Sequence, residues 1–173
     1  MYYQSKQKQF HLLGGIGAFL AGVGGIINLI VSTSYYVNSG LLIITAILGI
    51  SANALLITYL IGTFQQTRES LVKVGSLIGA IGYGLLAFLA FLQLAGVVTL
   101  VFNLIAAIIA MAGIVMLCIK FIMLFQRDVF IVVFCIFVFL GLLMSFFLTW
   151  ADLITGCSMG ALLIYFYTHN ITY

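Results

Sequence analysis

Long stretches without a charged side chain constrain the fold of this chain more than any other feature. Residues 96–119, GVVTLVFNLIAAIIAMAGIVMLCI, contain no charged side chain, and similar apolar runs fill most of the 173 residues. The sequence is 65% hydrophobic and only 5% charged, whereas a soluble domain typically carries about 25% charged residues. Such a chain lacks the polar residues to cover a water-exposed surface. We therefore expect it to lie in a lipid bilayer.

The length of these runs distinguishes between helices and strands. Every backbone N–H and C=O group in hydrocarbon must be hydrogen-bonded within the protein, so only α-helices and closed β-barrels span a bilayer. A barrel strand needs roughly 10 residues of alternating polarity, whereas these runs are apolar on all sides and about twice as long. We therefore expect one all-α integral membrane domain over residues 1–173, with six transmembrane helices. The predicted spans are residues 12–33, 41–64, 74–93, 96–119, 129–148 and 151–168.

Short connections pair these spans into three hairpins, at about residues 12–64, 74–119 and 129–168, after a short cytoplasmic N-terminal segment of residues 1–11. All six basic residues lie before the first span or beside the second and fourth connections, so they share one side of the bilayer. Lys and Arg concentrate in cytoplasmic segments. Both termini are therefore predicted to be cytoplasmic, in a plasma or inner membrane. The basic residues are Lys6, Lys8, Arg68, Lys73, Lys120 and Arg127.

Two matches at the same offset suggest that a hairpin was duplicated. GGIGAF at residues 14–19 resembles GAIGYG at residues 79–84, and the same offset relates Asn28 to Gln93. A tandem hairpin repeat is one interpretation of these matches. The other is chance, because Gly-rich segments of low complexity align with one another without a common origin.

Small residues recur along one face of several predicted spans. Lipid tails are as apolar as Leu, so helices in a bilayer associate mainly through close packing, which needs small residues on the shared face. Such residues follow alternating steps of three and four in residues 96–113. We expect these faces to hold the helices against one another rather than to line a site. The packing candidates are Gly14, Gly25, Gly75, Gly79, Gly96, Gly113, Gly156 and Gly160, which include the GxxxG pairs 75/79 and 156/160.

Three predicted spans carry an asparagine, at Asn28, Asn53 and Asn103. A buried amide is costly when it is unpaired, so each side chain is expected to face protein. The favoured interpretation is hydrogen bonding between helices, which contributes about 0.6 kcal/mol per bond and fixes their register. The alternative is a polar cluster that binds an ion or a small polar solute. The alternative requires at least two of the three residues to border one cavity.

The few ionisable residues near the span ends have ordinary structural interpretations. Asp152 begins the sixth span, where it is expected to cap the helix and interact favourably with its positive end. A cation-attracting group at a pore mouth is the alternative for Asp152. His11 and His169 lie near the cytoplasmic interface and are expected to be solvated, with haem or metal ligation as the alternative. We expect no cofactor and no metal.

The residue pattern also limits the classes of function. No ionisable residue lies in the middle of a span, which argues against proton-relay and ion-coupled transport. Asp152 and the two histidines are predicted on opposite sides of the bilayer, so they do not suggest an enzyme. The net charge of +3 comes without a Lys/Arg cluster, so no nucleic-acid partner is expected.

The sequence therefore favours a non-catalytic accessory, assembly or structural subunit that acts through helix–helix contacts in the bilayer. Its expected partner is another membrane subunit or a second copy of the chain. The alternative is a passive channel or small-solute carrier whose path is lined by Asn, Ser and Thr. A cofactor-binding membrane subunit is a third interpretation.

Overall fold

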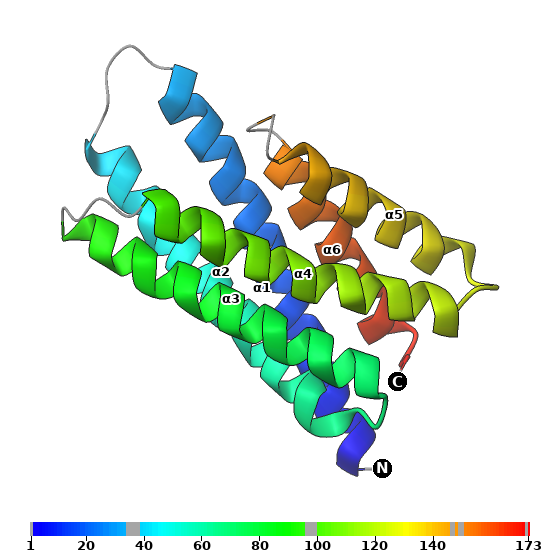
Figure 1. The fold of residues 1–173 in the computed structure, drawn as a ribbon. Helices are drawn as coiled ribbons and strands as arrows, with labels where there is room; N and C mark the ends of the chain where they lie inside the picture. Colours follow the sequence, from blue (N-terminus) through cyan, green and yellow to red (C-terminus); the bar gives the residue numbers. More distant parts are fainter. Residues whose placement is uncertain (1, 34–38, 96–99, 146–147, 149–150, 172) are drawn as a thin grey trace.

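The computed structural model describes residues 2–33, 39–95, 100–145, 148, 151–171 and 173, and all regular secondary structure in this part of the chain is α-helical (Figure 1). The predicted all-α fold with six helices is confirmed. Five helices are long and apolar enough to cross a membrane, and α5 is a shorter apolar helix. The helices are α1 (Tyr2–Thr33), α2 (Ser39–Gln66), α3 (Ser70–Leu94), α4 (Leu100–Leu124), α5 (Val129–Met144) and α6 (Ala151–Thr168).

The first helix differs most from its predicted bounds. We expected the first span to begin at residue 12, after a short N-terminal segment, but α1 begins at Tyr2 and continues without interruption to Thr33. Gln and Lys are good helix formers, so the polar start of the chain extends the helix. Gln7 and His11 on this extension are buried against the rest of the protein. Hydropathy alone could not reveal this contact.

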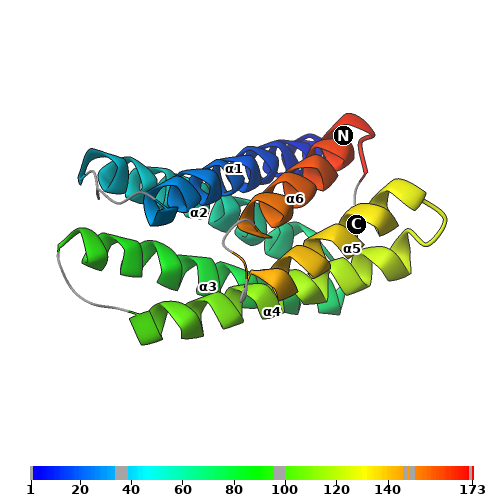
Figure 2. The same cartoon turned by 90° about the horizontal axis from the view of Figure 1, so that it is seen from above.

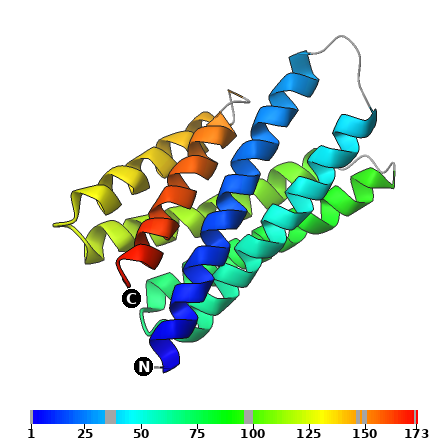
Figure 3. The same ribbon diagram turned by 180° about the vertical axis from the view of Figure 1, so that it is seen from behind.

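The six helices form a closed ring. Each helix packs against its neighbours in the chain, and α6 closes the ring on α1, while α4 and α5 form the loosest pair. Figure 2 shows α1 and α6 on one side of the molecule and α3 and α4 on the other. Figure 3 shows that both ends of the chain lie at one end of the ring, which we call the termini end.

Glycines bring neighbouring helices of the ring into backbone contact. A Cβ atom on Gly82 of α3 would meet the backbone of Ala110 on α4, and one on Gly113 would meet the backbone of Gly79. Between α1 and α6, a Cβ on Gly156 would lie 2.6 Å from the nitrogen of Gly22. Real side-chain atoms do not approach so closely, so these helix pairs depend on the missing Cβ.

The α5–α6 hairpin is shorter than the helices beside it. α5 has 16 residues and α6 has 18, whereas α1 has 32. Asp152 in the first turn of α6 lies beside Gly25 of α1, where an added Cβ would be 3.1 Å from the Cβ of Asp152. From Gly25, α1 continues to Thr33, which corresponds to about 12 Å of helix. The start of α6 is therefore recessed from the far end of α1.

The close approach of α3 and α4 gives a matched test. Gly82→Ala forces a methyl group into the backbone of α4 and is expected to destabilise the protein by about 1–3 kcal/mol. Gly84→Ala, two residues further along the same helix, is expected to have no destabilising effect, because nothing lies within 4 Å of the position of its Cβ atom. Thermal unfolding in detergent measures both variants. Equal effects of the two substitutions would contradict this packing.

Candidate functional site

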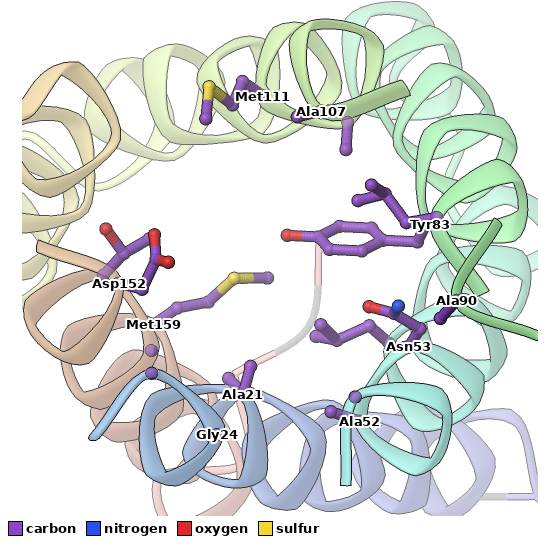
Figure 4. A pocket seen from close by; sticks show the side chains of 18 of the residues that line it. Ala21, Gly24, Ala52, Asn53, Tyr83, Ala90, Ala107, Met111, Asp152 and Met159 are labelled. Atoms are coloured by element: carbon purple, nitrogen blue, oxygen red, sulfur yellow. The ribbon is translucent and has the colours of Figure 1, made fainter. Parts of the chain in front are cut away.

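A cavity of about 410 Å³ lies inside the ring, and all six helices contribute to its wall. Figure 4 looks into this cavity, with the helices arranged around it. Small residues make up much of the wall. They are Ala18, Ala21, Gly24 and Gly25 of α1, Gly49 and Ala52 of α2, Ala90 of α3, Ala107 and Ala110 of α4, and Gly156 of α6.

Glycines keep this part of the ring hollow. Gly24 is buried and Gly49 is half-buried, yet nothing lies within 4 Å of the position that a Cβ would occupy on either residue. These two glycines therefore do not bring helices together, in contrast to Gly82 and Gly113. Six helices in a ring leave space along their common axis, and short side chains cannot fill it. The cavity follows from the residue sizes on this face.

Polar residues from four helices, α2, α3, α4 and α6, line the same cavity. Asn53 of α2 and Asn103 of α4 both line the cavity, so the requirement for a shared cavity is met by two of the three asparagines. The side chain of Asn28 and all of Gly96 lie outside the described residues. The polar lining residues are Thr45, Asn53, Tyr83, Gln93, Asn103, Asp152 and Thr155, with Gly24 and its neighbours supplying α1's part of the wall.

Asp152 is the one charged side chain among the residues that line the cavity. It was expected to cap α6 and to interact with its positive end. It lies in the first turn, at that end, but one residue inside the helix and at the level of Gly25. Tyr83 of α3 lines the same cavity. Figure 4 shows Tyr83 and Met159 pointing toward each other across the cavity, with Asp152 on the wall beside Met159.

Aromatic side chains close the termini end of the ring. We call the residues His11, Tyr59, Phe121, Phe166 and Tyr173 the aromatic plug. The ring of Tyr173 lies 4.7 Å from that of Phe121 and 5.3 Å from that of His11. Its hydroxyl is 2.8 Å from the hydroxyl of Tyr59. A tyrosine hydroxyl is protonated at neutral pH and can donate, and burial raises the pKa of Tyr173 further.

The two histidines lie in different surroundings. His11 was expected to be solvated, but it is fully buried in the plug, because α1 extends past it into contact with Tyr173. Neither ring nitrogen of His11 has a hydrogen-bond partner, although the backbone of Ile171 is near enough to interact with the ring. His169 is exposed, as expected, and stacks on Tyr165 with 4.0 Å between ring centroids.

The remaining packing candidates lie between helices. Gly14 faces Tyr59, whose Cγ would be 2.6 Å from an added Cβ, and Gly160 faces Phe19 at 2.8 Å. Gly75 lies against α4, where an added Cβ would be 3.1 Å from the carbonyl oxygen of Gly113, and Gly79 lies against the same residue. Gly25 and Gly156 each contact a neighbouring helix and also line the cavity.

Sequence reasoning missed Tyr83 and Met159 as cavity residues. Tyr83 belongs to the segment GAIGYG of the predicted repeat, but that match did not indicate a site. The same holds for Gln93, another cavity residue, which matches Asn28 in the repeat. An aromatic ring or a thioether in an apolar helix is usually a packing residue. Only the direction in which α3 and α6 turn these side chains distinguishes the two roles.

Comparison of the chain with models of protein families, with curated protein sequences and with solved structures gives no match. The site is therefore defined by its own geometry. It consists of a hollow with one carboxylate and several amide and hydroxyl groups, next to an aromatic plug at the termini end.

If the cavity is hydrated, cysteines placed at two adjacent positions of α2 should differ in their reaction with a water-soluble reagent. In a Cys157→Ser background, Asn53→Cys is expected to react with a water-soluble cationic methanethiosulfonate, because its thiol faces the cavity. Ala54→Cys is expected to stay unmodified, because Ala54 is exposed on the outside of the ring, where hydrocarbon excludes the reagent. Mass spectrometry of the protein in liposomes measures both. Equal labelling, or labelling at 54 alone, would contradict the site.

Proposed function

We propose that this chain is a non-catalytic membrane protein that binds a small solute inside the ring and carries it passively across the bilayer. The observation that supports this proposal is the cavity, to which α2, α3, α4 and α6 each contribute polar side chains. Polar groups within a membrane protein are costly and typically mark a solute path. The volume lies within the range of about 300–1,000 Å³ that is usual for small-molecule sites.

The aromatic plug favours a carrier over an open channel. A solute in the cavity would meet Leu56 and Met159 at its deep end and then the packed rings of Tyr59, Phe166 and Tyr173. Passage therefore needs a rearrangement that separates these rings. Carriers move solutes in this way, by exposing a central site to one side of the membrane at a time.

We expect such a rearrangement to occur most easily between α4 and α5, because these helices pack least closely. These helices form the loosest pair of the ring, and an apolar groove of about 270 Å³ lies between them. Met111 and Leu142 border both the groove and the cavity, so two flexible apolar side chains separate the cavity from the outside of the ring. The groove is lined by Ile108, Met111, Ala112, Val115, Phe139, Leu142 and Leu143.

Orientation follows from charge. The basic residues of the α2–α3 and α4–α5 connections lie at the termini end, as does Lys8 of α1. By the positive-inside rule, we propose that the termini end and its plug face the cytoplasm of a plasma or inner membrane. The cavity then faces the opposite compartment. Solute enters from that side in the conformation described.

The accessory-subunit role stays a prediction. Its motivation was the set of small-residue faces, which could hold a partner helix. Within the described residues, Gly75, Gly113 and Gly156 use these faces against other helices of the same chain. The faces therefore contribute to closing the ring and do not favour a partner subunit over self-contained packing.

Filling the cavity should stop transport without unfolding the protein. Gly24→Leu places a side chain in space that is empty, so stability is expected to hold while solute entry falls to the rate of protein-free liposomes. Gly84→Leu is the control, because Gly84 also has open space around it but does not line the cavity. Uptake of glycerol, urea, choline and lactate into proteoliposomes measures both. If none of these solutes enters faster than in protein-free liposomes, the carrier proposal fails.

Weakening the plug should make the protein leaky. Tyr173→Ala removes a ring and the hydroxyl contact with Tyr59, so glycerol flux through proteoliposomes is expected to rise several-fold. Tyr167→Ala is the matched control, because Tyr167 lies on α6 at the same end but contacts Lys8 rather than the plug. An equal flux for the two variants would contradict the role of the plug.

A further inference from the structure

The cavity carries a single formal charge, and that charge is negative. Asp152 is the one acidic residue among those that line it, and the lining contains no Lys, Arg or His within the described part of the chain. The carboxylate is recessed by about 12 Å from the end of α1 at Thr33. Asp152 is exposed and lines the cavity, so a cation that enters the cavity has access to the carboxylate.

The shape of the cavity distinguishes between a metal ion and an organic cation. Divalent ions such as Ca²⁺ and Mg²⁺ require at least six oxygen ligands, usually with more than one carboxylate, at about 2.0–2.6 Å. This wall has one carboxylate, and most of it consists of Ala, Gly, Leu and Met side chains around about 410 Å³. A bare ion would be poorly coordinated here. An organic cation would use both the charge and the apolar wall.

Two further side chains suit an ammonium group beside Asp152. Tyr83 and Asp152 border the same cavity, so a ligand inside it has access to both residues. The ring of Tyr83 and the thioether of Met159 point toward each other across the cavity (Figure 4). Aromatic faces attract ammonium groups, and the attraction strengthens where water is excluded. Thus the carboxylate and the aromatic ring border the same space from α6 and α3.

Other residues of the wall suit an uncharged polar group. Asn53 of α2 and Asn103 of α4 supply amides, which both donate and accept hydrogen bonds. We infer that the cavity binds a small organic monocation, with its ammonium group between Asp152 and Tyr83 and a hydroxyl or carbonyl group near the asparagines. This inference names the solute class of the proposed carrier. The test of transport rests on the carrier proposal, whereas the test of binding does not.

Binding is tested with cations and an uncharged analogue of the same shape. The probes are choline, phenyltrimethylammonium and 3,3-dimethyl-1-butanol, which has the shape of choline without the charge. Calorimetry on the purified protein is expected to show that at least one cation binds, and that choline binds more tightly than its uncharged analogue. Failure of both cations to bind, or equal affinity for choline and its analogue, would overturn the inference.

Two acidic residues provide matched variants. Asp152→Asn keeps the shape of the side chain and is expected to weaken cation binding at least about tenfold, without changing the affinity for the uncharged analogue. Asp128→Asn is the control, because Asp128 caps α5 at the termini end, away from the cavity. Thermal unfolding establishes that both variants are folded. Unchanged cation binding by Asp152→Asn would overturn the inference.

Transport separates this inference from the carrier proposal. Uptake of choline that is lost in both Asp152→Asn and Gly24→Leu supports the two together. Uptake of glycerol or urea that depends on an open cavity, without Asp152-dependent cation binding, overturns the solute class and leaves the carrier. Cation binding that depends on Asp152, without uptake of any probe, overturns the carrier and leaves the binding site.

Discussion

Backbone contact between neighbouring helices is the interaction on which this architecture depends. In a bilayer, helices gain little by exchanging lipid for Leu, so a stable ring needs pairs that approach closely enough for dispersion forces and weak polar contacts to accumulate. Gly113 meets Gly79 between α3 and α4, and Gly156 meets Gly22 between α1 and α6. Without these contacts, little free energy would favour a closed ring of six apolar helices over separate helices in lipid. The close contacts between neighbouring helices hold the ring together around the cavity.

The same residue type serves two opposite purposes in this ring. Gly82 lies in backbone contact with a neighbouring helix, whereas Gly24 borders open space. Composition and spacing are alike in the two cases, so the sequence could predict that small residues matter but not which purpose each one serves. The asparagines present the same difficulty. The cost of an unpaired amide in hydrocarbon predicted that Asn53 and Asn103 face protein, and only the closure of the ring brings them to one cavity.

The depth of Asp152 illustrates what sequence reasoning could not supply. The bounds of the sixth helix, residues 151–168, follow directly from the apolar run and agree with the structure. Its depth depends instead on how far α1 extends beyond Gly25, and that length is a property of another segment. Likewise, the polar residues before position 12 gave no sign of a buried helical turn, because their burial depends on Tyr173 at the other end of the sequence.

The closed aromatic plug contains an uncompensated polar group. His11 is fully buried and its ring nitrogens lack hydrogen bonds. Leaving a buried polar group unsatisfied costs about 1–3 kcal/mol, which opposes the packing of the surrounding rings. The contact between the hydroxyls of Tyr59 and Tyr173 offsets part of this cost. For the carrier proposed above, this cost narrows the free-energy gap between a closed and an open plug, so that neither state would trap the solute.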